Sequence, residues 1–343
     1  MENILVRGKK LKLPEFFPDA TFGKIRGLGN SELKKLNLNG LVVNTYHLWK
    51  EGTIKKIEKA RGIHKFMGFN GVIISDSGGF QVMSLIHRNP ELGKIKGDKI
   101  TFLLDGKKLE MTPESCIKMQ LKIGSDIVMC LDDCTESEDS LEKQKLSVER
   151  TICWAEKCKK EFDKLTKNKK NKPLIFAIIQ GGDNKELRKK CADGLKKVGF
   201  DGYAFGGWPV KDRILLRETL EYTASLMPDD KIKYCMGVGK PQDIIECVKM
   251  SYNLFDCVIP TRDARHKKLY VFENKSKHGV INIKGIHNNS KEKVSELCDC
   301  ELCRNHTLGD LHRLFIEDKK EAGRLATIHN LTFYRDLMSQ LSF

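Results

Sequence analysis

Short apolar runs, rich in β-branched residues, alternate with longer stretches of mixed polarity along most of the chain. An apolar run of roughly four to eight residues is typical of a strand buried on both faces, and the stretches between the runs have the length of helices. Seven candidate strands follow, at residues 41–43, 71–74, 126–131, 174–179, 203–205, 232–236 and 254–259. This alternation predicts an α/β fold with a parallel sheet.

Nearly every candidate strand ends in polar residues or glycine, in the segments 44–47, 76–79, 132–134, 180–182, 206–207 and 237–240. An open, doubly wound sheet is the rival architecture, but it would gather such groups near one switch point. In a (β/α)8 barrel all strand ends contribute to a single face, which is where active sites lie. We therefore predict a (β/α)8 TIM barrel, and we place its eighth strand at residues 279–283.

The chain has 343 residues, of which 40% are hydrophobic, enough for one large core and a small appended unit. The polar segment 284–297 is the best candidate boundary. We predict a catalytic barrel with an N-terminal extension at 1–285, and a small subdomain with a C-terminal helix at 286–343. No apolar run approaches the ~20 residues of a membrane helix, and the first residues lack the pattern of a secretory signal, so we expect a cytoplasmic protein.

Positive charge exceeds negative charge over the chain as a whole, with 61 Lys and Arg against 46 Asp and Glu and a net charge of +15. Such an excess favours a nucleic acid or another anionic surface as partner. A single lysine-rich run such as 167–172 indicates only a solvated surface, so the inference depends on the whole-chain excess.

Twelve cysteines in a chain without an export signal indicate reduced thiols and metal ligands rather than disulfides. Cys298, Cys300 and Cys303 form the spacing Cys-x-Cys-x-x-Cys, and His329 follows farther along. Three thiolates and one imidazole complete a tetrahedral zinc site with no open position, so we predict one structural zinc ion. The competing candidates for the fourth ligand are His306 and His312.

One carboxylate, Asp256, interrupts an apolar run in the last candidate strand. Burying an unpaired carboxylate is costly, so its presence there indicates chemistry. Pro260 should end the strand, and Arg262 and Arg265 follow in the predicted loop, where they suit a polyanionic substrate or form salt bridges at the barrel rim. We interpret Asp256 as a nucleophile or a base.

Four motifs occur together and in order: Ser-Asp-Ser-Gly-Gly-Phe-Gln-Val at 75–82, Met-Gly-Val-Gly-Lys-Pro at 236–241, Phe-Asp-Cys-Val at 255–258 before Pro-Thr-Arg, and the cysteine cluster. From about residue 44 to its end the chain resembles the tRNA-guanine transglycosylases, and most closely the bacterial type. The resemblance implies a (β/α)8 barrel with a zinc subdomain. It also implies an enzyme that replaces guanine at the wobble position of G-U-N anticodon tRNAs with a 7-deazaguanine, in queuosine modification.

The resemblance implies roles for two carboxylates. Asp256 would be the nucleophile that attacks C1′ of the ribose, and Asp76 would be the general acid/base for the leaving and entering bases. Base exchange with retained configuration needs two displacements, through a covalent tRNA–enzyme intermediate. Apart from the resemblance, Asp76 also fits a turn-capping residue before Ser-Gly-Gly.

The residues implied for base recognition fall at strand ends. Asp132 matches the carboxylate that pairs with the amidine edge of a guanine-like base, and Gln180 and the Gly207 N–H match the groups that contact its carbonyl. Phe80 and Met236 match the residues that sandwich the base. The residues implied to bind the anticodon loop around the flipped-out nucleotide are Lys240, Asp243, Arg262 and Arg265.

The chain departs from the family pattern after Gly207, where a leucine and small residues are usual but this chain has Trp208 and Pro209. This segment lines the pocket for the 7-substituent of the base, so both preQ1 and queuine are candidates for the incoming base. Val210 and Cys134 resemble the bacterial enzymes, which take preQ1.

Two other hypotheses stay open. Related barrels insert 7-deazaguanines into DNA, although the match at Lys240, Arg262 and Arg265 favours tRNA. Some family members are noncatalytic partner subunits, although the presence of both Asp76 and Asp256 argues against that role. The resemblance further implies a homodimer, whose second subunit helps to hold a tRNA too large for one barrel.

Overall fold

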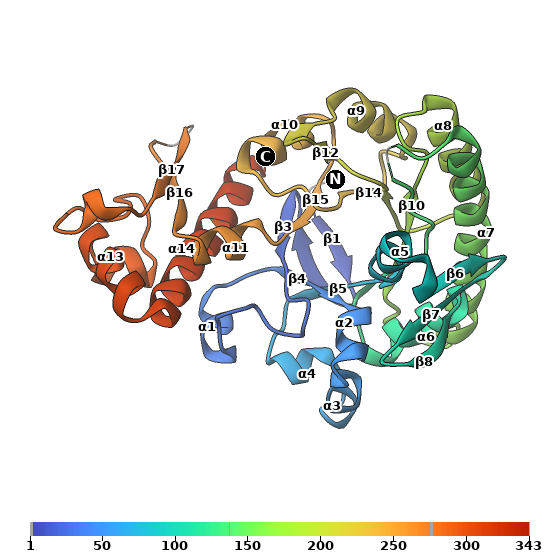
Figure 1. The fold of residues 1–343 in the computed structure, drawn as a ribbon, viewed down its shortest axis with the longest axis horizontal. Helices are drawn as coiled ribbons and strands as arrows, with labels where there is room; N and C mark the ends of the chain where they lie inside the picture. Colours follow the sequence, from blue (N-terminus) through green and yellow to red (C-terminus); the bar gives the residue numbers. More distant parts are fainter. Residues whose placement is uncertain (1–2, 137, 275–276, 343) are drawn as a thin grey trace.

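The computed structural model describes residues 3–136, 138–274 and 277–342, and its centre is an eight-stranded parallel sheet (Figure 1). The strands are β3 (Glu15–Pro18), β4 (Gly40–Asn44), β5 (Val72–Asp76), β9 (Ile127–Met129), β10 (Leu174–Ile179), β11 (Gly202–Phe205), β14 (Ile232–Cys235) and β15 (Leu254–Cys257). Their order in the sheet is β3-β15-β14-β11-β10-β9-β5-β4. Around the sheet the strands therefore follow one another in chain order, and β3 lies between β15 and β4.

The chain after β3 joins the two edges of the sheet. Asp19 and Val42 form a parallel bridge, and the Ala20 N–H donates a 2.7 Å hydrogen bond to the Val42 carbonyl. The Asn44 N–H donates to the Thr21 carbonyl at 3.4 Å. The sheet is therefore a nearly closed barrel, as predicted, and the doubly wound alternative is wrong.

All seven predicted strands are present, but the predicted eighth strand is wrong. Strand β17 (His278–Asn282) pairs antiparallel with β16 (Lys268–Phe272) in a separate hairpin. The eighth barrel strand is β3, whose Glu-Phe-Phe-Pro sequence contains no β-branched residue although all four residues are buried. The last predicted strand also ends early, at Cys257, and Pro260 lies in the first turn of helix α11 (Ile259–Arg265) rather than ahead of a loop.

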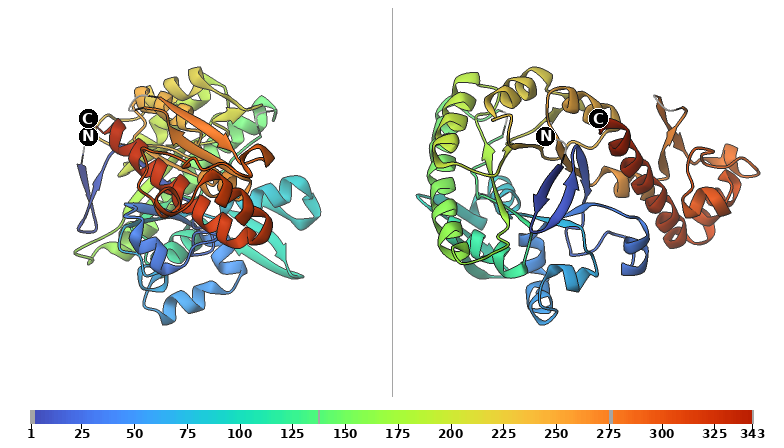
Figure 2. Two further views of the ribbon diagram at one scale, coloured as in Figure 1. Left: turned by 90° about the vertical axis from the view of Figure 1, so that its left-hand side faces the viewer. Right: turned by 180° about the vertical axis from the view of Figure 1, so that it is seen from behind.

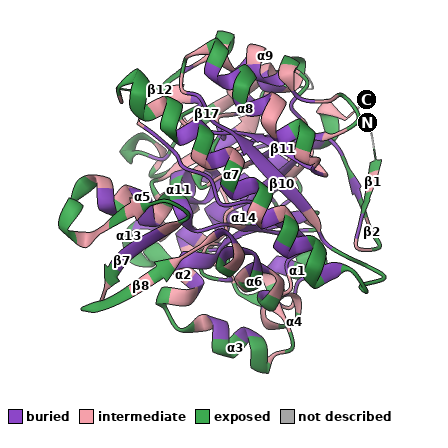
Figure 3. Ribbon diagram, turned by 90° about the vertical axis from the view of Figure 1, so that its right-hand side faces the viewer, coloured by how far each residue is buried: buried purple, intermediate pink, exposed green. Residues whose placement is uncertain are grey.

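Helices cover the outside of the barrel (Figure 2). The longer ones that follow barrel strands are α5 (Gly79–Arg88), α6 (Pro113–Ile123), α7 (Leu141–Thr166), α8 (Lys185–Val198), α9 (Arg217–Leu226) and α10 (Pro241–Lys249). Each turns an apolar face inward, as Trp154 and Phe162 of α7 show by their burial. Helix α14 (Lys319–Leu341) packs against β3 and α11. Figure 3 shows β10 and β11 buried beneath helices whose outward faces are exposed.

A hairpin of β1 (Asn3–Val6) and β2 (Lys9–Lys12) closes the end of the barrel at the strand N-termini. Val6 and Leu11 pack among residues of the barrel interior. At the same end the buried Asp126 lies 2.7 Å from the Lys9 Nζ and 2.9 Å from the His64 Nε2. Because this end is filled, the strand C-termini form the accessible end of the barrel.

Shorter elements fill the connections. They are α1 (Asn30–Lys35), α2 (Thr45–Lys50), α3 (Thr53–Lys59), α4 (Ile63–Met67), η1 (Pro90–Leu92), the antiparallel sheet of β6 (Gly93–Lys96), β7 (Lys99–Leu104) and β8 (Lys107–Met111), and the hairpin of β12 (Val210–Lys211) and β13 (Ile214–Leu215). The hairpin β12–β13 directly follows Trp208 and Pro209 and begins at Val210.

The C-terminal part contains α12 (Glu301–Asn305), α13 (Leu308–Glu317) and α14. Leu311 and Phe315 of α13 share an apolar core with Leu325 of α14. In segment 284–297 the helical structure is limited to the short turn η2 (Gly285–His287), and the predicted division at 285/286 stays a prediction. Among the described helices, none combines the length and the apolar character needed to cross a membrane.

Candidate active site

A cavity of about 450 Å³ opens at the C-terminal ends of the barrel strands. It brings together both predicted catalytic residues and all of the predicted base-binding residues, which come from β5, β15, the start of α5 and the segments after β9, β10, β11 and β14. These lining residues are Asp76, Asp256, Phe80, Asp132, Cys134, Gln180, Gly207, Trp208 and Met236. The convergence follows from the barrel, because parallel strands deliver their last residues to one face.

Asp76 is the last residue of β5, and only Ser77 separates it from the glycines at which α5 begins. Its carboxylate accepts a 2.9 Å hydrogen bond from the Asn44 side chain, and its backbone carbonyl accepts one of 2.9 Å from the Thr45 hydroxyl. Burial raises the pKa of Asp76, which favours its protonated form more than for an exposed aspartate. A carboxyl with these properties suits proton transfer to and from a ligand in the cavity.

Asp256 lies in β15 and is held by two donors. The Tyr234 hydroxyl donates to Oδ1 at 2.7 Å, and the Gly237 N–H donates to the same oxygen at 3.0 Å. Burial raises the pKa of Asp256 to about 6, and the nearby Asp76 contributes to the rise. Within the described residues both hydrogen bonds go to Oδ1, so Oδ2 is left for a ligand.

Asp132 and Gln180 form a polar pair in the cavity. The Gln180 Nε2 donates to the Asp132 Oδ2 at 2.6 Å, and both side chains are buried. Burial raises the pKa of Asp132 to about 7, so small changes in its surroundings change its charge near neutral pH. The pair offers hydrogen-bond acceptors and donors to a polar ligand in the cavity.

Aromatic side chains flank the cavity. Phe80 and Trp208 meet edge to face with their ring centroids 5.5 Å apart, and 36% and 42% of their surfaces are exposed. Met236 lines the same cavity. Two rings and a thioether suit a planar ligand, because such groups pack closely on an aromatic face.

The predicted tRNA contacts lie outside the cavity lining, on the two helices that follow β14 and β15. Lys240 caps α10 and donates a 2.9 Å hydrogen bond to the Arg213 carbonyl, while Asp243 lies in the first turn of the same helix. Arg262 and Arg265 lie on α11, and the Arg262 side chain is half exposed. Both helices begin at the accessible end of the barrel, near Met236 and Asp256 in sequence.

Five further polar residues that line the cavity went unpredicted: Asp19, Thr21, Asn44, Gln81 and Tyr234. Asp19 follows β3, the strand that went unpredicted, and burial raises the pKa of its carboxyl. Tyr234 gave no signal because a tyrosine inside an apolar strand is ordinary core. Asn44 lies in the polar segment 44–47 and Gln81 in the motif 75–82. Their positions at a strand end and near a helix start were the signal that could have identified them.

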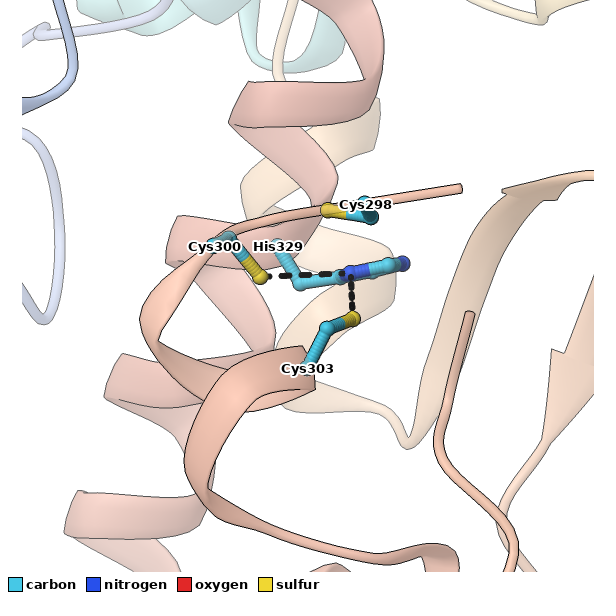
Figure 4. Close-up of side chains that lie close together, drawn as sticks. All are labelled: Cys298, Cys300, Cys303 and His329. Atoms are coloured by element: carbon cyan, nitrogen blue, oxygen red, sulfur yellow. Dashed lines mark hydrogen bonds between the residues drawn. The ribbon is translucent and has the colours of Figure 1, made fainter. Parts of the chain in front are cut away.

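A separate cluster joins Cys298, Cys300, Cys303 and His329, whose ligand atoms all lie within 4.8 Å of one another (Figure 4). The His329 Nδ1 is 3.6 Å from the Cys300 sulfur and 3.3 Å from the Cys303 sulfur. In a tetrahedral site with ordinary Zn–S and Zn–N bonds, sulfur and nitrogen ligands lie about 3.6 Å apart. The four residues therefore fit a zinc ion, and the competing His306 and His312 do not belong to the cluster.

The orientation of His329 supports this assignment. Its Nε2 lies 2.8 Å from the Tyr270 carbonyl, so the Nε2–H can donate there and leave Nδ1 as the metal ligand. His329 is 1% exposed and lies within α14, whereas the three cysteines lie at or just before α12. A bound ion would tie these two elements together.

Comparisons with known proteins agree over nearly the whole chain. The family model described as Queuine tRNA-ribosyltransferase matches residues 3–342. The queuine tRNA-ribosyltransferase of Haemophilus ducreyi is 38% identical over 335 residues, which cover 96% of this chain and 84% of that relative. Relatives of the same name from Actinobacillus pleuropneumoniae serotype 3 and Psychrobacter sp. are 38% and 36% identical, over 96% and 98% of this chain and 84% and 86% of their own lengths.

Proposed function

The chain belongs to the queuine tRNA-ribosyltransferase family, and from this premise we propose that it is a tRNA-guanosine(34) transglycosylase. It would exchange guanine at the wobble position of G-U-N tRNAs for a 7-deazaguanine, preQ1 or queuine, by double displacement. The observation that carries the proposal is the placement of Asp76 and Asp256 in one cavity with the Asp132–Gln180 pair. A retaining base exchange requires two carboxylates and polar groups that recognise the purine.

In the first displacement the Asp256 Oδ2 bonds to C1′ of the ribose while the bond from C1′ to the guanine nitrogen breaks. Asp76 gives its proton to the departing purine, so guanine leaves neutral and Asp76 becomes a carboxylate. In the second displacement Asp76 takes the proton of the incoming 7-deazaguanine, whose nitrogen attacks C1′. The bond from C1′ to Asp256 breaks as the new bond forms, which returns Asp256 as a carboxylate and Asp76 as a carboxylic acid.

The surroundings of Asp256 support its role as the nucleophile of the first displacement and the leaving group of the second. Two hydrogen bonds to Oδ1 stabilise the anion and fix its orientation. A pKa of about 6 leaves Asp256 ionised at neutral pH, and it is more basic than an exposed aspartate. Burial also raises the pKa of Asp76, which favours the protonated form that would donate to the departing base.

For base recognition we propose that Asp132 accepts hydrogen bonds from the amidine edge of the purine. The Gln180 side chain and the Gly207 N–H would contact the purine carbonyl. Phe80 and Met236 would hold the ring between them. The pocket for the 7-substituent would include Cys134, Trp208, Pro209 and Val210, which line the cavity together.

Binding of tRNA would use the excess of positive charge and the rim helices α10 and α11. Lys240, Arg262 and Arg265 would clamp phosphates beside the flipped nucleotide, with Asp243 near the same loop. We also propose a homodimer in the cytoplasm, since one barrel is small beside a tRNA. Sedimentation of the chain with and without tRNA tests the dimer. The affinity for tRNA should fall as salt concentration rises, and an affinity independent of salt would contradict the phosphate contacts.

The proposed zinc ion, one per chain, would be structural. Cys298, Cys300, Cys303 and His329 supply four ligands, so no position is left for water or substrate. The ion would hold α12 against α14, and α14 in turn packs against β3. It would therefore support the barrel without entering the reaction.

Incorporation of labelled guanine into an unmodified G-U-N tRNA tests the proposed function, followed by a chase with preQ1 or with queuine. Entry of label and its displacement by one base would support the exchange and identify the base. Duplex DNA of matching sequence serves as the parallel substrate. Label in DNA alone would favour the DNA hypothesis, and no label in either polymer with a folded, zinc-loaded protein would favour a noncatalytic subunit.

A further inference from the structure

A buried cation lies directly behind the part of the cavity lining that contains Gln180 and Gly207. Arg188 of α8 is 2% exposed. Within the described residues, all hydrogen bonds of its guanidinium go to backbone carbonyls and none to a carboxylate. Burying a cation without a counter-ion is costly, so its place beside a substrate cavity needs a reason.

The guanidinium joins three pieces of backbone. Its Nε donates to the Gly182 carbonyl at 2.7 Å, its Nη1 to the Ile179 carbonyl at 3.2 Å and its Nη2 to the Gly206 carbonyl at 3.0 Å. The ring of Phe205 lies against the guanidinium, 4.1 Å from centroid to Cζ. The planar fork therefore holds the ends of β10 and β11 and the loop after β10 in one arrangement.

The bond to Gly206 has a direct consequence for the next residue. The Gly206 carbonyl and the Gly207 N–H belong to the same planar peptide unit, in which they point in opposite directions. With the carbonyl fixed on Arg188, the N–H points away from Arg188. Gly207 adopts a φ of +89°, which favours glycine, and within the described residues its N–H has no partner in the protein.

We propose that Arg188 is a positioning residue that aims the Gly207 N–H at the carbonyl oxygen of the purine and strengthens that donor. A charged donor on a peptide carbonyl polarises the peptide unit, which makes its N–H a better hydrogen-bond donor. This inference rests on the proposed function. Arg188 thereby sets the preference for purines that carry a 6-carbonyl group, without touching the base itself.

The same arrangement assists the first displacement. As the bond from C1′ to guanine breaks, electrons move into the purine, and part of the negative charge develops on its carbonyl oxygen. A fixed, polarised N–H stabilises this charge more than it stabilises the neutral bound base. Loss of Arg188 should therefore lower kcat for exchange as well as base affinity.

The test compares guanine with 2-aminopurine, which lacks the 6-carbonyl oxygen, as inhibitors of labelled-guanine incorporation by the full zinc-loaded chain. We expect the wild-type protein to prefer guanine, and Arg188→Met to reduce that preference about tenfold. Affinity for tRNA should stay within about twofold. An unchanged guanine to 2-aminopurine ratio in Arg188→Met, with both affinities lowered equally, would overturn the proposal, because a merely structural role predicts that result.

Two further variants keep the test decisive. Arg188→Lys keeps the charge but cannot donate to all three carbonyls, so its preference for guanine over 2-aminopurine should also fall. This variant provides the test if Arg188→Met does not fold. Lys233→Met is the control, since Lys233 is a buried cation that donates to the Ala224 carbonyl at 3.0 Å and to the Asp229 carboxylate at 2.7 Å and does not line the cavity. Its ratio should stay at the wild-type value while its stability falls.

The proposal and the proposed function fail in different ways. If the wild-type protein exchanges guanine but binds both purines equally, the Gly207 contact and the role of Arg188 are wrong while the function stands. If it binds neither purine and exchanges neither, the proposed function is wrong.

Discussion

The Tyr234 hydroxyl donates a 2.7 Å hydrogen bond to the Asp256 carboxylate. Both residues line the cavity, and they lie on the neighbouring strands β14 and β15. The bond opposes the effect of burial on the pKa of Asp256, because it stabilises the ionised form. Tyr234 thereby lowers the pH at which Asp256 ionises.

Tyr234→Phe should lower kcat/KM for guanine exchange about tenfold, since one charge-assisted hydrogen bond is lost. It should also move the acidic limb of the pH–rate profile upward from about pH 6, because the pKa of Asp256 rises without its donor. The profile of labelled-guanine incorporation measures both effects. Tyr252→Phe is the matched control, since that buried hydroxyl donates to the Leu220 carbonyl instead. A shift in the control profile as large as in Tyr234→Phe would contradict the assignment.

Asp256→Asn should make the folded protein more stable above about pH 6. Folding raises the pKa of Asp256 from 3.8 to about 6, so the native state binds more protons than the unfolded state between these values, and stability falls as pH rises through that window. Asparagine keeps an acceptor for Tyr234 and Gly237 but carries no charge. Thermal unfolding at pH 5 and pH 8 should show the Tm advantage of the variant growing by a few degrees. A variant less stable at pH 8 than at pH 5, relative to wild type, would contradict this account.

Affinity for guanine should increase as pH rises through about 7, because only the ionised Asp132 accepts hydrogen bonds with both oxygens. Asp132→Asn should weaken guanine binding about tenfold or more and remove this pH dependence. Inhibition constants measured from pH 6 to pH 8 test both statements. An unchanged pH dependence in the variant would contradict this assignment and indicate that Asp76 or the ligand is the group that titrates.

Cys300→Ser should reduce the zinc content from one ion per chain and destabilise the contact between α12 and α14, since Cys300 is a buried member of the cluster. Elemental analysis and thermal unfolding measure the two effects. Cys153→Ser is the control, because Cys153 is exposed and lies outside the cluster. Full zinc content in Cys300→Ser would contradict the ligand set.

Much of the fold was predictable because parallel strands buried on both faces leave continuous apolar runs, as at residues 174–179. Strand β3 was missed for physical reasons. Its glutamate, Glu15, can be buried because the Asn39 side chain donates a hydrogen bond to it and because burial raises its pKa to about 7. A local sequence pattern reveals neither effect. Strand β17 at residues 278–282 has the β-branched residues of a strand, but local composition does not identify its partner, which is β16 rather than a barrel strand.

The site was predictable where chemistry is concentrated in motifs, as with Asp76 and the cysteine cluster. Tyr234 and Arg188 were not, because their roles depend on partners far away in the sequence or on backbone atoms. The carbonyls that Arg188 holds, such as that of Gly206, carry no side-chain signature. Only the folded barrel shows that a buried arginine stands behind Gly207.

In the proposed reaction Asp256 forms a covalent bond to the ribose of the wobble nucleotide. The most direct measurement is to mix the protein with G-U-N tRNA, denature the sample and look for a covalent complex by gel and by peptide mass spectrometry. We predict an adduct on Asp256 that disappears when preQ1 or queuine is added, and no adduct with Asp256→Asn. Guanine exchange by Asp256→Asn, or an adduct mapped to another residue, would contradict the account.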